Sequence, residues 1–290
     1  MAEGGDPSRT SVVVGVDGSE HSRRALEWAA GEARLRDAPL RIVHAFPFEL
    51  PRAGGSDPFV DAATQALRDV AARAHRLDPR PLTVSSDVVD GLPTRVLVEE
   101  SRQCALLVMG SRGHGGFERL LLGSTAVDVT AQADCPVAVV PAGGDDSSRS
   151  DVVVGVDESE GSERALEFAF SRAVHRQVGL VAVHVWQLPT AYGAYAGADL
   201  LRTGPERVEA EARALLEGML SPWQARYPQV AVTRRVVRGQ AVAELAQASS
   251  AQGEVVVVGA RGRSVLAGAL VGSVSQGLLH HAAGPVVIVR

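Results

Sequence analysis

Short valine-rich runs without polar alternation recur along the chain, and longer amphipathic stretches separate them. Continuous apolar runs are typical of buried parallel strands, and amphipathic stretches are typical of the helices that connect such strands. The pattern therefore predicts an α/β fold. In the first half we expect strands at 11–16, 40–45, 82–89, 105–109 and 137–140, and helices at 20–36, 59–76, 93–101 and 124–133. In the second half we expect strands at 151–156, 179–185, 230–237, 254–258 and 286–289.

The chain also contains an internal repeat, which is the first feature to examine in a chain of this length. The sequence VVVGVD at 12–17 recurs at 152–157, an offset of 140 residues. The G-x-x-G segment at 110–113 is matched at 259–262, an offset of 149 residues. The second copy therefore carries about nine extra residues, which fall around 190–206.

A segment rich in Pro, Gly, Ser and Asp separates the two copies, and this composition is typical of a linker. We therefore expect a tail at 1–8, a first domain at 9–141, a linker at 142–150 and a second domain at 151–290. Crossovers between parallel strands are right-handed, so the chain is predicted to form two tandem doubly wound domains. Each would be a five-stranded parallel sheet flanked by helices.

The composition is that of a globular protein and excludes several classes of function. Hydrophobic residues make up 46% of the chain and charged residues 22%, and the net charge of -5 comes without a long basic cluster. Nucleic acid and membrane surfaces are therefore not expected as partners. No Lys and no Asn occurs, so all 29 basic residues are Arg. This excludes a Walker P-loop, a pyridoxal-phosphate lysine and a protein kinase site, and it suggests a high-GC genome.

The cysteines and the N-terminal residues bear on the cellular compartment. Cys104 and Cys135 are too few for a disulfide framework and lie beside apolar runs, so we expect buried, reduced thiols. Residues 1–10 contain acids, Gly and Pro where a signal peptide needs a basic start and an apolar stretch. Since no apolar run approaches the roughly 18 residues of a membrane span, a cytoplasmic location is expected.

Glycines and hydroxyl residues follow the predicted strands at the sheet edge where ligands bind in open parallel sheets. In the first domain the candidate binding residues are Gly15, Asp17, Gly110, Arg112, Gly113, Gly115, Gly116, Gly123, Ser124 and Thr125. In the second domain they are Gly155, Asp157, Gly259, Arg261, Gly262, Arg263, Gly272, Ser273 and Val274.

These segments have the chemistry to bind a phosphate without a lysine. Glycines after a strand let backbone N–H groups approach an anion, and a Gly-Ser pair at a helix start offers free amides and a hydroxyl. One glycine-rich loop is weak evidence, but G-x2-G-x9-G-S occurs twice in register with the repeat. Arg112 and Arg261 have two interpretations, contact with phosphate oxygens or exposure to solvent.

Asp17 and Asp157 stand at the tip of the first strand of each repeat. A carboxylate there can hydrogen-bond a ribose or nucleobase, help to hold a cation that bridges phosphates, or cap a helix. Ser19 and Ser159 are expected N-caps, because a serine hydroxyl satisfies an orphan N–H of the first turn. The histidines at 280–281 lack a supporting acid or cysteine cluster, so no metal site of protein side chains is expected.

With these motifs, both halves resemble the universal stress protein family, in its tandem, nucleotide-binding subclass. The family pattern is a strand ending in Asp, a strand ending in His and a small apolar residue, the G-x2-G-x9-G-[ST] segment, and a closing strand next to Pro. The second feature is His44-Ala45 in the first half and His184-Val185 in the second. The fourth feature is Cys135-Pro136-Val137 in the first half and Gly284-Pro285-Val286 in the second.

The resemblance implies an adenine nucleotide alpha hydrolase-like fold and one bound ATP in each domain, with or without Mg²⁺ or Mn²⁺. The adenine would lie against the backbone of Ala45 or Val185. In the first domain the phosphates would lie on Gly113, Gly123, Ser124 and Thr125. In the second domain they would lie on Gly262, Gly272, Ser273 and Val274. The Gly115-Gly116 pair is replaced by Ser264-Val265 in the second copy, so the two sites can differ in affinity.

The resemblance also implies a stress-response regulator in the cytoplasm. Its nucleotide would act as a ligand and signal and would not be turned over efficiently as a substrate. Family domains pair through closing strands such as 137–140 and 286–289, which implies an internal pseudo-dimer and allows a homodimer. A regulatory protein partner is expected but not identified. Two alternatives stay open: a slow ATPase or nucleotidyl-transferring enzyme, and a nucleotide-free scaffold that binds proteins.

Overall fold

The computed structural model of the chain divides into two compact units, each of which is described by itself. The described residues are 10–46, 72, 82–113, 122–143, 151–187, 204–262 and 271–290. By backbone proximity, residues 1–144 with 285–288 and 290 form the first unit, and residues 145–284 with 289 form the second. The predicted tail at 1–8, and the helix predicted at 59–76 apart from residue 72, lie outside the described residues.

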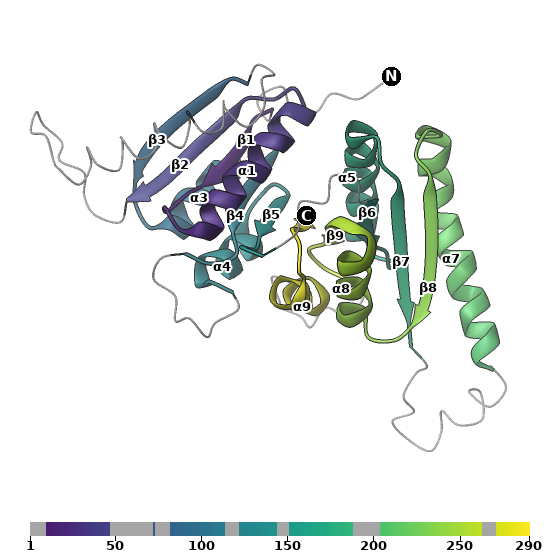
Figure 1. Cartoon of the computed structure of the whole chain (residues 1–290). Coiled ribbons are helices and arrows are strands. Elements are labelled where there is room, and N and C mark those ends of the chain that lie inside the picture. Colours follow the sequence, from purple (N-terminus) through teal and green to yellow (C-terminus); the bar gives the residue numbers. More distant parts are fainter. Residues whose placement is uncertain are drawn as a thin grey trace, which may run out of the picture. The chain divides into compact units, whose positions relative to one another are not determined.

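The first unit contains a parallel sheet with the strand order β3-β2-β1-β4-β5 (Figure 1). Its strands are β1 (Val12–Gly15), β2 (Leu40–Phe46), β3 (Val84–Asp90), β4 (Leu106–Gly110) and β5 (Val137–Val140). Its described helices are α1 (Glu20–Leu35), α3 (Pro93–Ser101) and α4 (Ser124–Gln132). Pro285 and residues 286–288 of β10 (Val286–Val289) belong to this unit, and residues 286–288 pair antiparallel with β5.

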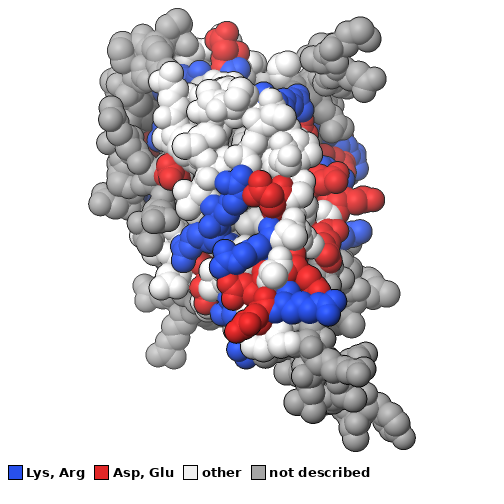
Figure 2. Space-filling model, turned by 90° about the vertical axis from the view of Figure 1, so that its right-hand side faces the viewer, with Lys and Arg blue, Asp and Glu red and all other residues white. Residues whose placement is uncertain are grey.

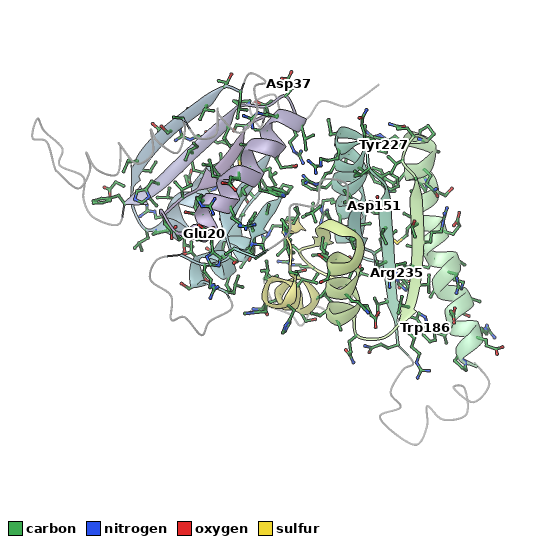
Figure 3. The ribbon with its side chains drawn as sticks, in the orientation of Figure 1. Glu20, Asp37, Asp151, Trp186, Tyr227 and Arg235 are labelled. Carbon is green, nitrogen blue, oxygen red and sulfur yellow. The ribbon has the colours of Figure 1, made fainter. Side chains whose placement is uncertain are left out.

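The second unit repeats this arrangement, with the parallel strand order β9-β6-β7-β8. Its strands are β6 (Asp151–Gly155), β7 (Leu180–Trp186), β8 (Val232–Arg238) and β9 (Gly253–Gly259). Its described helices are α5 (Glu160–Arg176), α7 (Pro205–Arg226), α8 (Ala241–Gln252) and α9 (Ser273–His281). Trp186 and Arg235 mark β7 and the edge strand β8 in Figure 3.

Helices cover both faces of each sheet, because the right-handed crossovers run in opposite directions from the central strand. In the second unit α5 packs against α7, and α8 packs against α9 (Figure 1). In the first unit α3 packs against α4, while α1 lies on β1, β4 and β5. The predicted doubly wound α/β fold, a sheet flanked by helices, is confirmed.

The core of each unit is built from the valine-rich strands and one stripe of each helix. Val12 and Val14 of β1 are fully buried, as are Val152 and Val154 of β6. On α1 the buried side chains recur at helical spacing, so that one face of the helix is apolar. The strand ends lie within about two residues of the predicted ones, because runs of buried apolar residues define them closely.

The two cysteines lie in the core of the first unit, just before β4 and β5. Cys104 and Cys135 are both free and buried, as predicted, with 3.5 Å between their Sγ atoms. The hydrogen bond to Cys135, together with burial, raises the pKa of the Cys104 thiol well above its usual range. A neutral thiol packs like a small apolar side chain, so the pair contributes to the core.

Charged side chains of both signs are interspersed on α7 and β8 (Figure 2). On α7, Arg207 Nε lies 3.0 Å from Glu211 Oε1, and Arg234 Nε of β8 lies 2.6 Å from Glu217 Oε2. Exposed pairs of this kind contribute roughly 0–1 kcal/mol each to stability. Their charges cancel locally, so these pairs do not produce the basic surface that nucleic-acid binding requires. None of the described helices combines the length and apolar character needed to cross a membrane.

The equivalent leucines of α1 and α5 test the core assignment. Leu26 is 1% exposed and Leu166 is fully buried, so replacing either with Ala leaves a cavity. We expect each substitution to lower the free energy of unfolding by about 3 kcal/mol, measured by urea denaturation of the whole chain. Leu92→Ala is the control, because Leu92 is 65% exposed; its effect is expected to stay within about 0.5 kcal/mol. A loss at Leu92 equal to that at Leu166 would contradict the assignment.

Candidate functional site

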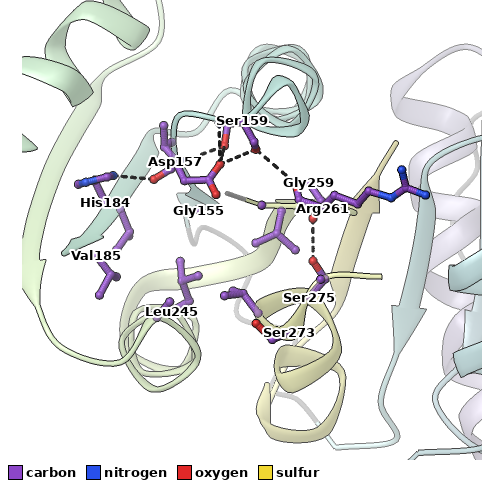
Figure 4. Close-up of a pocket in the computed structure, with 18 residues that line it drawn as sticks. Gly155, Asp157, Ser159, His184, Val185, Leu245, Gly259, Arg261, Ser273 and Ser275 are labelled. Atoms are coloured by element: carbon purple, nitrogen blue, oxygen red, sulfur yellow. Dashed lines mark hydrogen bonds between the residues drawn. The ribbon is translucent and has the colours of Figure 1, made fainter. Parts of the chain in front are cut away.

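A cavity of about 210 Å³ lies in the second unit at the carboxyl ends of the parallel strands (Figure 4). Nine of the ten residues predicted for the second domain line it: Gly155, Asp157, Val185, Gly259, Arg261, Gly262, Gly272, Ser273 and Val274. The tenth, Arg263, lies outside the described residues. Residues far apart in the sequence thus meet at one place, because the carboxyl ends of parallel strands share one edge of the sheet.

Asp157 follows β6, and hydrogen bonds from α5 hold its carboxylate. Oδ1 accepts the backbone N–H of Ser159 at 3.1 Å and the hydroxyl of Ser162 at 2.7 Å. The Asp157 N–H in turn donates to Ser162 Oγ at 2.8 Å. The other carboxylate oxygen, Oδ2, faces Gly262, where a Cβ atom would lie only 2.6 Å from it. A side chain at position 262 would therefore force the Asp157 carboxylate to move.

A histidine bond ties the second strand of each repeat to the segment that carries the aspartate. His184 is 6% exposed, and its Nδ1 lies 2.8 Å from the carbonyl oxygen of Val156. Because a carbonyl only accepts, Nδ1 carries the proton and donates it. His44 makes the same 2.8 Å bond to Val16 O in the first unit. In both repeats, therefore, a histidine ring on the second strand is hydrogen-bonded to the backbone just before the aspartate.

The N-terminus of α9 borders the cavity. Gly272 is the N-cap residue and offers no side-chain cap, and its own N–H donates to Ala260 O at 2.7 Å. Ser275 Oγ donates to Gly259 O at 2.6 Å, which ties the helix to the end of β9. The first-turn amides of a helix have no intrahelical acceptor, and the helix dipole makes this end positive. The arrangement is suited to an anion.

The first unit has the corresponding geometry. Asp17 Oδ2 faces Gly113 so closely that a Cβ atom there would collide with it. Gly123 N donates to Ser111 O at 2.8 Å, and Gly123 is the uncapped N-cap residue of α4, which begins with Ser124 and Thr125. The other predicted residues lie at strand ends or in the following loop: Gly15 on β1, Ala45 on β2, Gly110 on β4 and Arg112 after it. Gly115 and Gly116 lie outside the described residues.

The two arginines of the glycine loops differ in their surroundings. Arg112 Nε donates to His21 Nε2 of α1 at 3.1 Å. In the second repeat Gly161 takes the place of His21, and a Cβ atom there would lie 2.7 Å from Arg261 O. Arg261 is exposed, and its side chain extends away from the cavity in Figure 4. The Arg261 side chain is therefore exposed to solvent, whereas the Arg112 side chain is hydrogen-bonded to α1.

The prediction of serine N-caps is right for one repeat and wrong for the other. Ser19 Oγ accepts the N–H of Ser22 at 3.1 Å and so caps α1. Ser159 occupies the N-cap position of α5 but makes no side-chain cap bond. Its hydroxyl lies within hydrogen-bond distance of Asp157 Oδ1 and of Arg261 O instead. The neighbouring carboxylate is a stronger acceptor and competes with capping for the hydroxyl.

Several cavity residues were not predicted from the sequence. They are Val156, Ser162, Val183, Ala241, Leu245, Val258 and Ser275. Ala241 and Leu245 come from α8, whose ordinary apolar sequence gives no sign of a site. In both repeats a leucine lies where a Cβ atom on the last residue of the first strand would collide with it: Leu245 for Gly155, and Leu97 for Gly15. Among the described residues, no group of three or more His, Cys, Asp or Glu is placed to hold a metal ion.

Comparison with known proteins identifies the family. The model of the universal stress protein family matches residues 9–141 and 149–290. The chain belongs to this family. A universal stress protein of Mycobacterium tuberculosis (strain ATCC 25618 / H37Rv) is 38% identical over 299 residues, which cover 96% of each chain.

Solved universal stress proteins share the fold. The crystal structure of one from Archaeoglobus fulgidus DSM 4304 covers 97% of this chain and 96% of its own, with 21% identity and a TM-score of 0.67. Another from Archaeoglobus fulgidus was solved in complex with dAMP; it is 26% identical, covers 46% of this chain and 98% of its own, and has a TM-score of 0.37. The bound dAMP is a property of that protein.

The contact between His21 and Arg112 predicts a pH dependence of stability. Burial lowers the pKa of His21 below its ordinary value of 6.5, and the positive charge of Arg112 lowers it further. The folded chain therefore binds fewer protons at His21 than the unfolded chain does, so the free energy of unfolding rises with pH through the interval below 6.5. We expect His21→Gln to flatten this rise, measured by urea denaturation from pH 5 to 7.5. Parallel pH curves for the variant and the parent chain would refute the contact.

Proposed function

We propose that the chain binds an adenine nucleotide, ATP, at the carboxyl edge of the sheet in each domain. The observation that supports this most strongly is the convergence of three groups on one cavity of the second unit: the Asp157 carboxylate, the loop at Gly262 and the N-terminus of α9. A nucleotide has a donor-rich nucleoside and an anionic phosphate chain. The aspartate suits the first, and the positive helix end suits the second.

The distribution of lining residues fits such a ligand. Apolar side chains of Val185 and Leu245 line the part of the cavity beside β7 and α8 (Figure 4). Gly272 and Ser273 line the part at the start of α9. An apolar end for a base and an amide-rich end for phosphates are what a nucleotide pocket requires. The proposal includes a Mg²⁺ or Mn²⁺ ion, which would neutralise phosphate charge; Asp157 and Asp17 are the acids that would help to hold it in the second and the first site.

The role that we propose is a stress-response regulator in the cytoplasm, with the nucleotide as ligand and signal. The hydrogen bonds support binding rather than catalysis. The proton on His184 Nδ1 is committed to Val156 O, and the side chain of Arg261 extends away from the cavity. Pairing of the two repeats as an internal pseudo-dimer, a homodimer of the chain and an unidentified regulatory protein partner complete the proposal.

Alanine in place of Gly262 tests the second site. The φ of Gly262 is one that any residue adopts, so the substitution adds only a Cβ atom, 2.6 Å from Asp157 Oδ2. The carboxylate must then move, and we expect ATP affinity at this site to fall by about tenfold or more in a calorimetric titration. Gly113→Ala should do the same to the first site.

Gly218→Ala is the matched control, because nothing lies within 4 Å of a Cβ atom at this position of α7. Its titration is expected to match that of the parent chain. Each of the two variants, Gly262→Ala and Gly113→Ala, should keep parent-like ATP affinity at the site that its substitution does not touch. If both glycine variants bind ATP as the parent does, the proposed site is wrong. If the parent chain itself binds no adenine nucleotide, the proposed function is wrong.

A further inference from the structure

The two repeats carry the same aspartate and serines but use the serine hydroxyls differently. The first repeat contains Asp17, Ser19 and Ser22, and the second contains Asp157, Ser159 and Ser162. Each residue of the second set follows its counterpart in the first by 140 positions. Sequence alone gives these two sets the same role. The hydrogen bonds separate them.

In the first repeat the serines serve the helix. Ser19 Oγ accepts the N–H of Ser22 at 3.1 Å. Ser22 Oγ donates to the backbone carbonyl oxygen of Ser19 at 2.9 Å. A hydroxyl has a single hydrogen, so the Ser22 hydroxyl, donating to Ser19 O, is committed to the first turn of α1.

In the second repeat the equivalent hydroxyl serves the carboxylate. Ser162 Oγ donates to Asp157 Oδ1 at 2.7 Å and accepts the Asp157 N–H at 2.8 Å. Ser162 is 3% exposed and borders the cavity. These two bonds close a ring that links the Ser162 hydroxyl to both the backbone N–H and the carboxylate of Asp157.

This ring adds a bond from a side chain to the backbone bond that orients the carboxylate in both repeats, which is Ser19 N–H to Asp17 Oδ1 in the first and Ser159 N–H to Asp157 Oδ1 in the second. Oδ1 is held by Ser162 and by the N–H of Ser159, so the side chain cannot exchange its two oxygens without breaking both bonds. Oδ2 is thereby directed toward Gly262. A group already held in its binding orientation loses less conformational entropy when a ligand arrives.

We propose that Ser162 is a positioning residue of the second nucleotide site, which fixes the Asp157 carboxylate for a hydrogen-bond donor of the nucleoside, and that Ser22 has no such role in the first site. This inference rests on the proposed function. The two sites then depend on different side chains, although the repeats supply the same residue types. The proposed role of Ser162 is exerted through Asp157.

The test compares Ser162→Ala with Ser22→Ala by calorimetric titration with ATP. The Gly113→Ala chain isolates the second site, and the Gly262→Ala chain isolates the first. We expect Ser162→Ala to weaken ATP binding at the second site by about tenfold, since a hydrogen bond to a charged group is lost. Ser22→Ala is expected to change the first site by less than about twofold. Urea denaturation of each variant checks that it is folded.

A double-mutant cycle with Asp157→Ala separates positioning from general disruption of α5. If Ser162 acts through Asp157, Ser162→Ala has no further effect once the carboxylate is gone. An equal loss in both backgrounds would show a structural role and overturn the proposal. Ser162→Cys keeps the side-chain size but donates poorly, so it should bind as weakly as Ser162→Ala. Parent-like affinity of the Cys variant would mean that filling of space, not the hydrogen bond, matters.

The outcomes distinguish this inference from the proposed function. If the parent chain binds ATP at the second site and Ser162→Ala binds it equally well, only the role of Ser162 is wrong. If the parent chain and the Gly113→Ala chain bind no ATP, the nucleotide site and the positioning role are both overturned.

Discussion

Parallel strand pairing is the constraint on which the candidate site depends. In the second unit Gly155 pairs with Val183 on β7, and Val154 pairs with Val257 on β9. This register brings the carboxyl-terminal parts of three strands to one edge of the sheet, so that residues from all three meet there. The first unit has the same parallel register around β1, where Val14 pairs with Ile42. Valine-rich strands buried on both faces thus create a site that no single strand contains.

Close approach of backbone segments then shapes that site. The loop after β9 lies against the aspartate after β6, and a side chain at position 262 would displace the carboxylate from its present place. The His184 bond to Val156 O holds the aspartate segment from the other side. These contacts leave Asp157 and the start of α9 on a common cavity. The fold therefore brings a fixed negative charge and a positive helix end into one small space, which a ligand with both polar donors and an anion can satisfy.

The sequence predicted the fold and many of the positions at this edge, for two physical reasons. Buried parallel strands need continuous apolar runs, which makes them visible, and the repeat shows every motif twice. What the sequence did not reveal depends on side-chain competition. Ser159 was expected to cap α5, but a carboxylate two residues away attracts its hydroxyl. Leu245 lines the cavity from an ordinary amphipathic helix, and an apolar residue there looks like any core residue.

The central claim is that both repeats hold an adenine nucleotide, and the most direct measurement counts the nucleotide carried by the protein. The chain is purified without added nucleotide and denatured, and the released small molecules are quantified by mass spectrometry against the chain concentration. The account predicts that the purified chain, or the chain after incubation with ATP and removal of the excess, releases close to two adenine nucleotides per chain. Release of none in either case would contradict it and would favour a scaffold in which the repeated glycines serve only as turns.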